Sequence, residues 1–453
     1  MHRHFGKFLA LIAVGLVLAA PAAAGEENAL REEVRQLREK VEALQGQQSA
    51  LLATEIEKYL DSSADMRSAQ GDGPLAGVKI SARFTGVMQA TVGLDPANRA
   101  VFNGDVDLDF DFAVTDNLDL FIHLTANEGQ SDSEFDPFDG DLGDNGGFPS
   151  QFGSVSVGFP SESFGPIAGP TLSGLADGIG VNGTVPTDPG SITVYEAGIY
   201  HRMQVGSRTL HWELGAIDPR RRFLQNAFAD DENTQFINNL FDDSPSVLWL
   251  TTAAGNTVYG LHMWMNFGDN NQYTVNWGWF NAPGQWFNRG QFYFQFGWKG
   301  EVNGREMNLR IMGFIDEFAR DSTDDGSVGG GASWDWWATD KVGVFIRIAA
   351  NGGDVNPVDF DASFGVQFNG LIGSRPDDVI GVAIGFITAN DTVLVGIPED
   401  TEFTIEVYYR YMMEDGKLQI TPHLMIVTDP GGNLSPWQDD TLFILGIRIH
   451  VPF

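Results

Sequence analysis

A strict alternation of acidic and apolar residues is the feature that most limits what this chain can fold into. In the stretch NGDVDLDFDFAVTDN, residues 103–117, two sets of side chains alternate: Asp105, Asp107, Asp109 and Asp111 with Val106, Leu108, Phe110 and Phe112. A period of two places the carboxylates on one face of a β-strand and the apolar side chains on the other. Such a strand must separate water from an apolar medium.

The same period begins at Val78 and continues to the C-terminus. Candidate strands begin near residues 440, 417, 401, 378, 361, 342, 329, 307, 290, 272, 257, 208 and 192, and three more precede them, giving about 16. Each has about 9–12 residues, enough for a tilted membrane crossing. Short turns lie on one side and long loops on the other, as in bacterial outer-membrane barrels. We predict an all-β transmembrane barrel of about 16 antiparallel strands over residues 78–453, with 128–191 as one long loop.

A secreted, soluble carbohydrate-binding β-protein is the alternative, because soluble sheets also have one apolar and one polar face. The apolar face is rich in aromatic residues, such as Phe292, Phe294 and Phe296, which favours lipid and its interfacial girdles. The chain also ends on Phe453 in an alternating strand, a pattern similar to the one recognised by the outer-membrane assembly machinery. The expected location is therefore the bacterial outer membrane, with lipid and the assembly machinery as partners.

The N-terminal part of the chain has a different pattern. Residues 1–24 combine Arg3 and Lys7 with an apolar run and a small-residue cleavage site, which predicts a secretory signal peptide. Residues 25–60 carry apolar residues at heptad spacing, which predicts a helical coiled-coil segment in the periplasm, and 61–77 is a polar linker. A solvated amphipathic helix is the alternative for 25–60. We expect a homotrimer, held by barrel contacts or by the coiled coil.

Composition excludes several functions. The chain has 27 Lys+Arg against 61 Asp+Glu, a net charge of -34, which argues against nucleic acid as a partner, since binding there depends on neutralising phosphates. It has no cysteine for a thiolate or a zinc cluster, and neither G-x-S-x-G nor H-E-x-x-H occurs. We therefore expect a protein that is not an enzyme. An outer-membrane hydrolase built from separated His and Ser residues is the alternative.

With the apolar face assigned to lipid, the four aspartates must face the water of a pore. A three-residue turn at 115–117 would pair Val114 with Leu118 and place Asp109 opposite His123, Asp107 opposite Thr125 and Asp105 opposite Asn127. Other charged residues on polar faces are predicted to line the same lumen: Lys79, Arg83, Arg310, Arg347, Glu406, Arg410 and His423. A salt-bridge network that stiffens the barrel is the alternative for each of them.

A calcium site is the alternative for the aspartate run. An EF-hand loop needs Gly at its sixth position and Glu at its twelfth, where this sequence has Phe110 and Asp116, so a channel wall is favoured. The acidic loop 131–147 could bind Ca²⁺ at the outer surface. Otherwise no cofactor is expected, and the pattern assigns no metal ligands.

Three stretches resemble the OprB-type carbohydrate-selective porins. They are AIDPRRRFLQNAFADDENTQFINNLF (216–241), FGVQFNGLIGSRPDDVIGVAIG (364–385) and EFTIEVYYRYMMEDGKLQITPHLMIVTDPGGN (402–433) with the terminal strand after it. The resemblance implies a 16-stranded outer-membrane barrel for passive diffusion of monosaccharides and other small polar solutes. It also places the loop 218–241 near the channel constriction.

That loop supplies the candidate constriction and solute-binding residues, which are Arg220, Arg221, Arg222, Asn226, Asp230, Asp231 and Glu232. Three consecutive cations facing an acidic wall would produce a transverse field that orders polar solutes. Surface ion pairs between the arginines and the acids at 230–232 are the alternative. A general or cation-selective porin without sugar preference is the alternative function.

Overall fold

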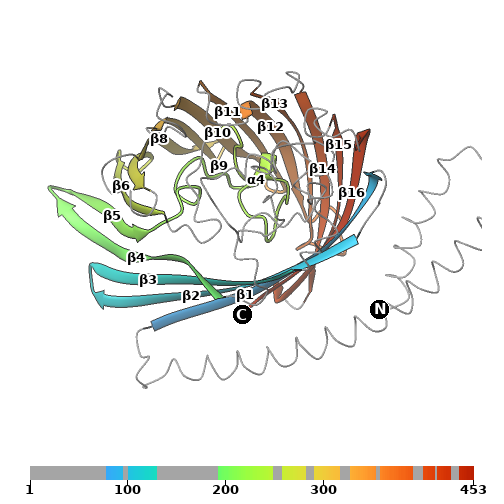
Figure 1. Cartoon of the computed structure of the whole chain (residues 1–453). Coiled ribbons are helices and arrows are strands. Elements are labelled where there is room, and N and C mark those ends of the chain that lie inside the picture. The colour runs from blue at the N-terminus through green and yellow to red at the C-terminus, as the bar shows by residue number, and fades with distance from the viewer. Residues whose placement is uncertain are drawn as a thin grey trace, which may run out of the picture. The chain divides into compact units, whose positions relative to one another are not determined.

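The computed structural model describes residues 78–94, 100–129, 192–247, 258–281, 290–316, 327–352, 358–390, 401–413, 416–429 and 438–453. These residues contain sixteen β-strands that form one closed antiparallel barrel (Figure 1). Each strand pairs with its neighbours in sequence, and β1 closes the barrel by pairing with β16. The predicted barrel and its strand number are confirmed.

The strands begin within a few residues of the positions that the alternation predicts. Their bounds are β1 Val78–Leu94, β2 Ala100–Thr115, β3 Leu118–Gly129, β4 Ile192–Val205, β5 Arg208–Ala216, β6 Tyr259–Phe267, β7 Tyr273–Asn281, β8 Gln291–Val302, β9 Arg305–Asp316, β10 Ser327–Thr339, β11 Val342–Asn351, β12 Val358–Asn369, β13 Val379–Ala389, β14 Thr401–Met413, β15 Leu418–Thr428 and β16 Gln438–Pro452. A four-residue helix, α4 (Asn239–Asp242), lies between β5 and β6.

Strand length differs from the prediction at the closing seam. β1 has 17 residues, β2 has 16 and β16 has 15, more than a tilted crossing needs. These strands remain paired along nearly their full length, so the sheet extends beyond the minimum span.

The separation of short turns from long loops is also incomplete. The connection 370–378 lies at the short-turn end, yet it is longer than the connection 95–99 at the other end. It is held against β14 by its own contacts: Arg375 stacks on Tyr411 with 3.9 Å from Cζ to the ring centroid, and the Met412 amide donates to Asp378 at 3.0 Å. Loop length alone therefore does not assign the two ends of this barrel.

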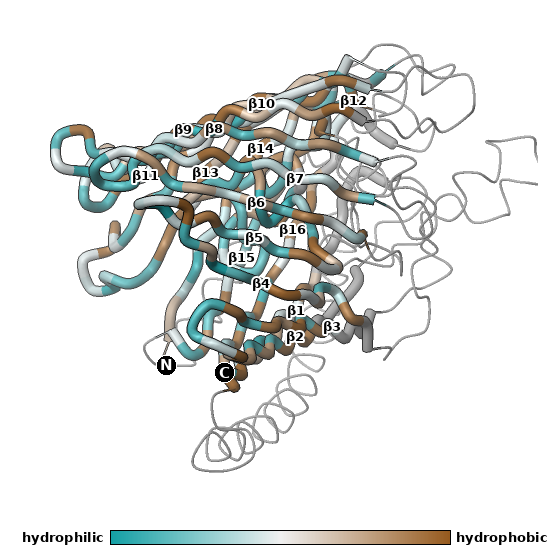
Figure 2. The backbone as a smooth tube through the Cα atoms, turned by 90° about the vertical axis from the view of Figure 1, so that its left-hand side faces the viewer, coloured by the Kyte–Doolittle hydropathy of each residue, from teal (hydrophilic) through white to brown (hydrophobic). Residues whose placement is uncertain are grey.

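The outer face of the wall is apolar. Phe292, Phe294 and Phe296 of β8 are 37%, 47% and 40% exposed, and Ile311 and Ile315 of β9 are about half exposed. Figure 2 shows hydrophilic and hydrophobic positions alternating along the strands. Large apolar side chains on the outside of a barrel match a lipid-facing wall and do not fit a soluble β-protein.

The register of the aspartate strand confirms part of the prediction. Asp109 pairs with His123, Asp107 with Thr125 and Asp105 with Asn127. The predicted pair of Val114 with Leu118 is wrong, because Thr115 pairs with Leu118 and a bulge follows Ala113. A two-residue turn plus one extra residue in β2 produces the same register farther along the strands as a three-residue turn would.

Several sequence-based predictions lie outside the described residues. These are the signal peptide 1–24, the coiled coil 25–60, the linker 61–77, the acidic loop 131–147 and nearly all of the loop 128–191. Within the described ranges, no helix has both the length and the apolarity needed to cross a membrane.

Candidate functional site

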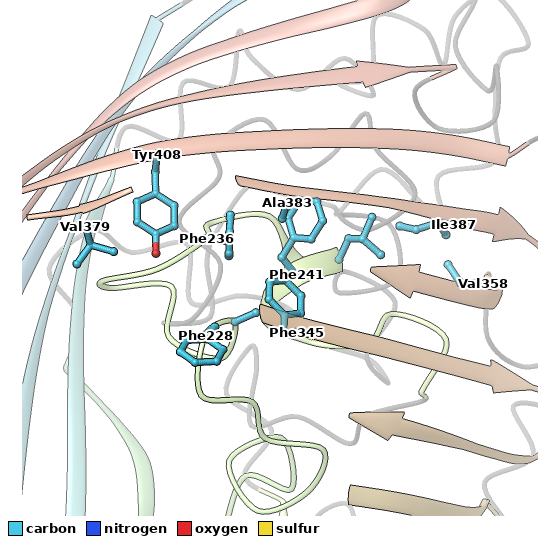
Figure 3. Close-up of a cluster of buried hydrophobic side chains, with 11 residues drawn as sticks. Phe228, Phe236, Phe241, Phe345, Val358, Val379, Ala383, Ile387 and Tyr408 are labelled. Atoms are coloured by element: carbon cyan, nitrogen blue, oxygen red, sulfur yellow. The ribbon is translucent and has the colours of Figure 1, made fainter. Parts of the chain in front are cut away.

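The segment between β5 and β6, residues 217–247, runs through the inside of the barrel (Figure 1). We call it the inner loop. Its aromatic side chains pack against inward-facing wall residues: Phe236 lies 4.9 Å from Tyr408 of β14 and 5.8 Å from Phe345 of β11, centroid to centroid. Figure 3 shows this cluster, in which Phe228, Phe236 and Phe241 meet the strands. The loop is therefore fixed to one side of the wall by buried apolar area.

A second apolar cluster fixes the start of the inner loop. Phe223 lies 5.3 Å from Tyr293 of β8 and 6.3 Å from Phe280 of β7, and Leu224 belongs to the same cluster. Phe223, Leu224, Phe280 and Tyr293 are each at most 2% exposed. The two clusters thus pack the inner loop against strands β7–β14.

Arg347 of β11 holds the inner loop by its backbone. The guanidinium is 1% exposed and donates to the carbonyl oxygens of Phe241, Asp243 and Ala229 at 3.0, 3.1 and 2.8 Å. It also donates to the carboxylate of Asp230 at 2.9 Å. The alternation of side chains along the strand predicts that Arg347 lines the lumen. The side chain does point inward, but the inner loop covers it.

Glu406 of β14 has the complementary role. Its two carboxylate oxygens accept the amide hydrogens of Ile237 and Asn238 at 2.9 and 3.0 Å, and the residue is fully buried. Nearby, Arg410 donates to the carbonyl of Thr234 at 2.9 Å. Glu406 and Arg410 were predicted to line the lumen, whereas both bind the backbone of the inner loop.

Two further predicted wall residues are also engaged. Arg310 of β9 donates to Asp335 of β10 at 2.8 Å. His423 of β15 is 4% exposed and packs against Gly446 of β16, where an added Cβ would lie 1.9 Å from its Nε2. The salt-bridge alternative therefore describes Arg310, and close packing describes His423.

A cavity of about 210 Å³ remains between the inner loop and β1. It brings together six of the predicted residues with others from the inner loop, and its lining residues are Arg83, Arg220, Arg221, Gln225, Asp230, Asp231, Glu232, Asn233, Asp242 and Asp243. Three arginines and five acids therefore face one small space. We call this space the charged gap.

The three consecutive arginines have different surroundings. Arg220 is buried and bonds Asp218 at 2.9 Å and Asp243 at 3.3 Å. Arg221 is 28% exposed and lies 3.5 Å from Glu196 of β4. Arg222 turns away to Glu213 of β5 at 2.7 Å. Arg220 and Arg221 line the charged gap, while Arg222 is not among its lining residues.

Asn226 is placed differently from the prediction. Its amide donates to Ser333 of β10 at 3.0 Å, its carbonyl oxygen accepts the Phe228 amide hydrogen, and only 5% of the residue is exposed. Its hydrogen-bonding groups stabilise the turn of the inner loop. It is not among the lining residues of the charged gap.

The aspartate strand reaches the inside of the barrel next to the charged gap. Asp107 is 2% exposed and accepts from Arg83 at 2.6 Å and from His123 at 3.2 Å. Asp109 is 33% exposed and lines a second cavity of about 290 Å³, which shares Arg83, Asp231 and Asn233 with the charged gap. The two cavities therefore adjoin at Arg83 of β1 and at Asp231 and Asn233 of the inner loop.

The other two aspartates, Asp105 and Asp111, belong to the same strand, β2. Asp111 is exposed and its backbone pairs with Lys79, which is exposed as well. Asp105 pairs with Thr85 in the register, and the surroundings of its side chain lie outside the described set. Of the three aspartates of this strand whose side chains the structure describes, Asp107 and Asp109 lie at the candidate site.

Burial and neighbouring charge change the titration of two loop residues. Burial raises the pKa of the Asp230 carboxyl well above its usual value, against the opposing effect of Arg347. Burial lowers the pKa of the Arg222 guanidinium, but the carboxylates of Glu196 and Glu213 outweigh this and raise it. Arg222 is a fixed cation, whereas Asp230 can change charge.

Sequence reasoning missed several residues that position the inner loop. Arg448 of β16 is fully buried and donates to the carbonyl of Glu232, and Asp361 of β12 accepts the amide hydrogen of Ser246 at 2.8 Å. Thr85 of β1 donates to Asn233 at 2.6 Å. The sequence did indicate that the inner loop is buried, because a solvent-exposed loop would rarely carry phenylalanines at 223, 228, 236 and 241.

Comparison with known proteins agrees with this architecture. Residues 314–453 match the family model described as carbohydrate-selective porin, OprB family. Over this stretch the sequence is similar to the OprB family of porins. Porin B of Pseudomonas aeruginosa is 28% identical over 135 residues, which cover 26% of this chain and 29% of Porin B. The match thus spans less than a third of that relative, and it confirms the resemblance seen in the sequence.

The fold has a solved counterpart in the OprB family. The high-pH structure of Pseudomonas putida OprB aligns with a TM-score of 0.61 at 17% identity, covering 83% of this chain and 94% of that one. At this identity the likeness shows a shared barrel fold. The family model that matches residues 314–453 describes porins. The motif 216–241 lies outside the matched residues, so its role at a constriction stays a prediction.

Metal binding has no candidate in the described part of the chain. No group of three or more His, Asp or Glu side chains there could hold an ion. The acidic loop 131–147, which prompted the Ca²⁺ hypothesis, is not among those residues.

Proposed function

We propose that this chain is an outer-membrane porin through which small polar solutes, monosaccharides foremost, diffuse passively. The observation that carries the proposal is the charged gap inside a closed barrel. The inner loop packs against β7–β14, and two described cavities lie between the loop and residues of β1, β2 and β16. A solute that crosses would then pass between Arg83 of the wall and the charged residues of the inner loop.

The chemistry of the gap suits uncharged polyols. Guanidinium groups only donate hydrogen bonds and ionised carboxylates only accept them, so a hydroxyl can bind either kind as it passes. Arginines and acids in one narrow space also produce a field that orders polar molecules. Because no nucleotide-binding motif occurs in the sequence, we infer diffusion down a gradient as the driving process.

The outer membrane is the compartment that this account requires. The apolar outer wall and the relation to the OprB family support it. The homotrimer, recognition of Phe453 by the assembly machinery, and a periplasmic coiled coil after a cleaved signal peptide stay predictions.

Liposome swelling tests the proposal. Purified protein is inserted into dextran-loaded vesicles, which are diluted into isotonic arabinose, glucose, maltose or raffinose. We expect fast swelling in the monosaccharides and a steep decrease with solute size, because the charged gap is small. Vesicles with heat-denatured protein are the control. Equal, background-level swelling in all four sugars would contradict a sugar-permeable porin.

A cation-selective channel without sugar preference is the second candidate. The excess of five acids over three arginines in the charged gap favours it. Reversal potentials in a salt gradient, measured with and without glucose, separate the two. Cation selectivity without any effect of glucose on the current would favour this candidate.

A further inference from the structure

Three inward-facing aromatic rings on neighbouring strands are partly exposed. Five other inward aromatic residues, Phe280, Tyr293, Phe314, Phe345 and Tyr408, are each at most 2% exposed, and each belongs to a cluster that contains inner-loop side chains. Tyr200 of β4, His211 of β5 and Trp264 of β6 are half-buried instead. The lumen of a porin is normally polar, so partly exposed rings there need an explanation.

The register places these three rings on the inside of the wall. His211 pairs with Trp264 on one side and with Arg202 on the other, and Tyr200 pairs with Glu213. Leu214 and Leu261, which alternate with these inward positions, are 45% and 37% exposed on the outer face. The rings therefore lie on the inner face of β4–β6.

The rings form one group with nearly parallel planes, which we call the aromatic platform. Tyr200 Oη lies 2.6 Å from His211 Nδ1, and their planes differ by 7°. Trp264 stacks on both, with centroids 5.6 Å from Tyr200 and 4.9 Å from His211 and with planes within 10°. Parallel rings joined by a hydrogen bond give a rigid surface with little conformational entropy to lose on binding.

Charged pairs lie on both sides of the aromatic platform. Towards the inner loop, Arg222 donates to Glu213 at 2.7 Å. Towards the short turn between β4 and β5, Arg202 donates to Asp119 of β3 at 2.9 Å, and their side chains are 37% and 25% exposed. The arginine also lies over the Tyr200 ring at 5.4 Å. Apolar ring faces thus lie beside accessible donors and acceptors.

We propose that the aromatic platform is a second solute subsite, on the short-turn side of the inner loop, that takes the apolar face of a pyranose ring while Arg202 and Asp119 bind its hydroxyls. A pyranose has a face of C–H groups and a rim of hydroxyls. Stacking removes apolar surface of both partners from water, and the ion pair supplies hydrogen bonds to the rim. This inference depends on the proposed function, since the subsite lies on the path of a permeating solute.

Glucose and sorbitol distinguish the subsite from general crowding of the pore. The two have similar hydroxyl chemistry, but only glucose has a ring with an apolar face. In planar bilayers, we expect glucose to reduce the ion current at lower concentration than sorbitol. The W264L variant should raise the half-blocking glucose concentration about three- to tenfold, the range expected for one lost ring contact, and leave that of sorbitol unchanged.

A matched control is available on the other side of the wall. Trp277 of β7 pairs with Met263, an outward position, so W277L should leave both half-blocking concentrations unchanged. Should W264L fail to form channels, Y200L tests the same surface and should act in the same direction. If the channel-forming variant has the same ratio of half-blocking concentrations of glucose and sorbitol as the unsubstituted protein, the subsite is overturned.

Two further results separate the possible failures. If W264L weakens the block of the current by phenol but not the block by glucose, the platform binds aromatic solutes. That result would overturn the carbohydrate assignment. If glucose enters vesicles in the swelling assay but W264L leaves the ratio of half-blocking concentrations of glucose and sorbitol unchanged, the aromatic platform alone is rejected. Absence of glucose entry into vesicles rejects the proposed function and the subsite with it.

Discussion

Arg347 of β11 and Asp230 of the inner loop form an ion pair with 2.9 Å between Nη2 and Oδ1, and only 1% of the arginine side chain is exposed. The same guanidinium donates to several carbonyl oxygens of the loop. Asp230 lines the charged gap on its other side. One wall residue therefore connects the position of the loop to the chemistry of the gap.

Replacing Arg347 should release the inner loop. R347Q leaves buried carbonyls and the Asp230 carboxylate without their donor, which we expect to lower the free energy of unfolding by about 3–5 kcal/mol. A loosened loop should also raise the single-channel conductance. Urea unfolding in detergent and bilayer recordings measure both.

The control for this prediction is R305Q at a turn. Arg305 pairs with Asp340, whose side chain is 88% exposed, so the loss should be about 0.5 kcal/mol or less with unchanged conductance. Equal effects of the two substitutions would show that Arg347 does not hold the loop.

The cation preference of the channel should decrease as the pH falls, beginning above the range of an ordinary aspartate. Burial raises the pKa of Asp230 well above its usual value, so protonation removes a negative charge from the charged gap at a higher pH. Reversal potentials from pH 8 to pH 4 would show the change. In D230N this part of the pH dependence should be absent, and its persistence would assign it to another group.

Removing the charge of Arg221 should increase cation preference. The side chain lines the charged gap and is 28% exposed. At a distance of about 7 Å in water one charge changes the energy of an ion by about 0.6 kcal/mol, roughly threefold in local cation concentration. R221Q should therefore shift the reversal potential towards the cation value. K299Q, at a side chain that is 64% exposed, should shift it much less.

An alanine at Gly446 should destabilise the barrel. Its Cβ would lie 1.9 Å from Nε2 of His423, which is buried beside it. Overpacking of this kind costs about 1–3 kcal/mol. G313A is the control, because the nearest atom to its Cβ would be 3.8 Å away. Equal unfolding midpoints for G446A and G313A would contradict the packing that we describe.

Strand position and side-chain parity could be predicted from the sequence, because in a barrel the polarity of the two faces alone decides them. Asp109 and His123 are opposite each other as expected. The bulge after Ala113 could not be predicted, since a bulge and a longer turn give the same alternation farther along the strand.

Parity could not distinguish a residue that lines open lumen from one that binds the inner loop. Arg347 and Glu406 point inward as predicted, but the loop covers both. The path of the loop depends on tertiary packing of Phe228 and Phe236 against the wall, which no local pattern determines. The arginine run illustrates the same limit, because Arg222 binds Glu213 and does not line the gap.

The most direct test of the central claim is chemical modification of the charged gap in a conducting channel. The chain has no cysteine, so Q225C places a single thiol on an exposed side chain that lines the gap. F294C places one on the outer wall, where the side chain is 47% exposed. A charged methanethiosulfonate reagent should reduce the current of Q225C in steps and leave F294C unchanged. An unchanged Q225C current, with modification verified by mass, would show that solutes do not pass the charged gap.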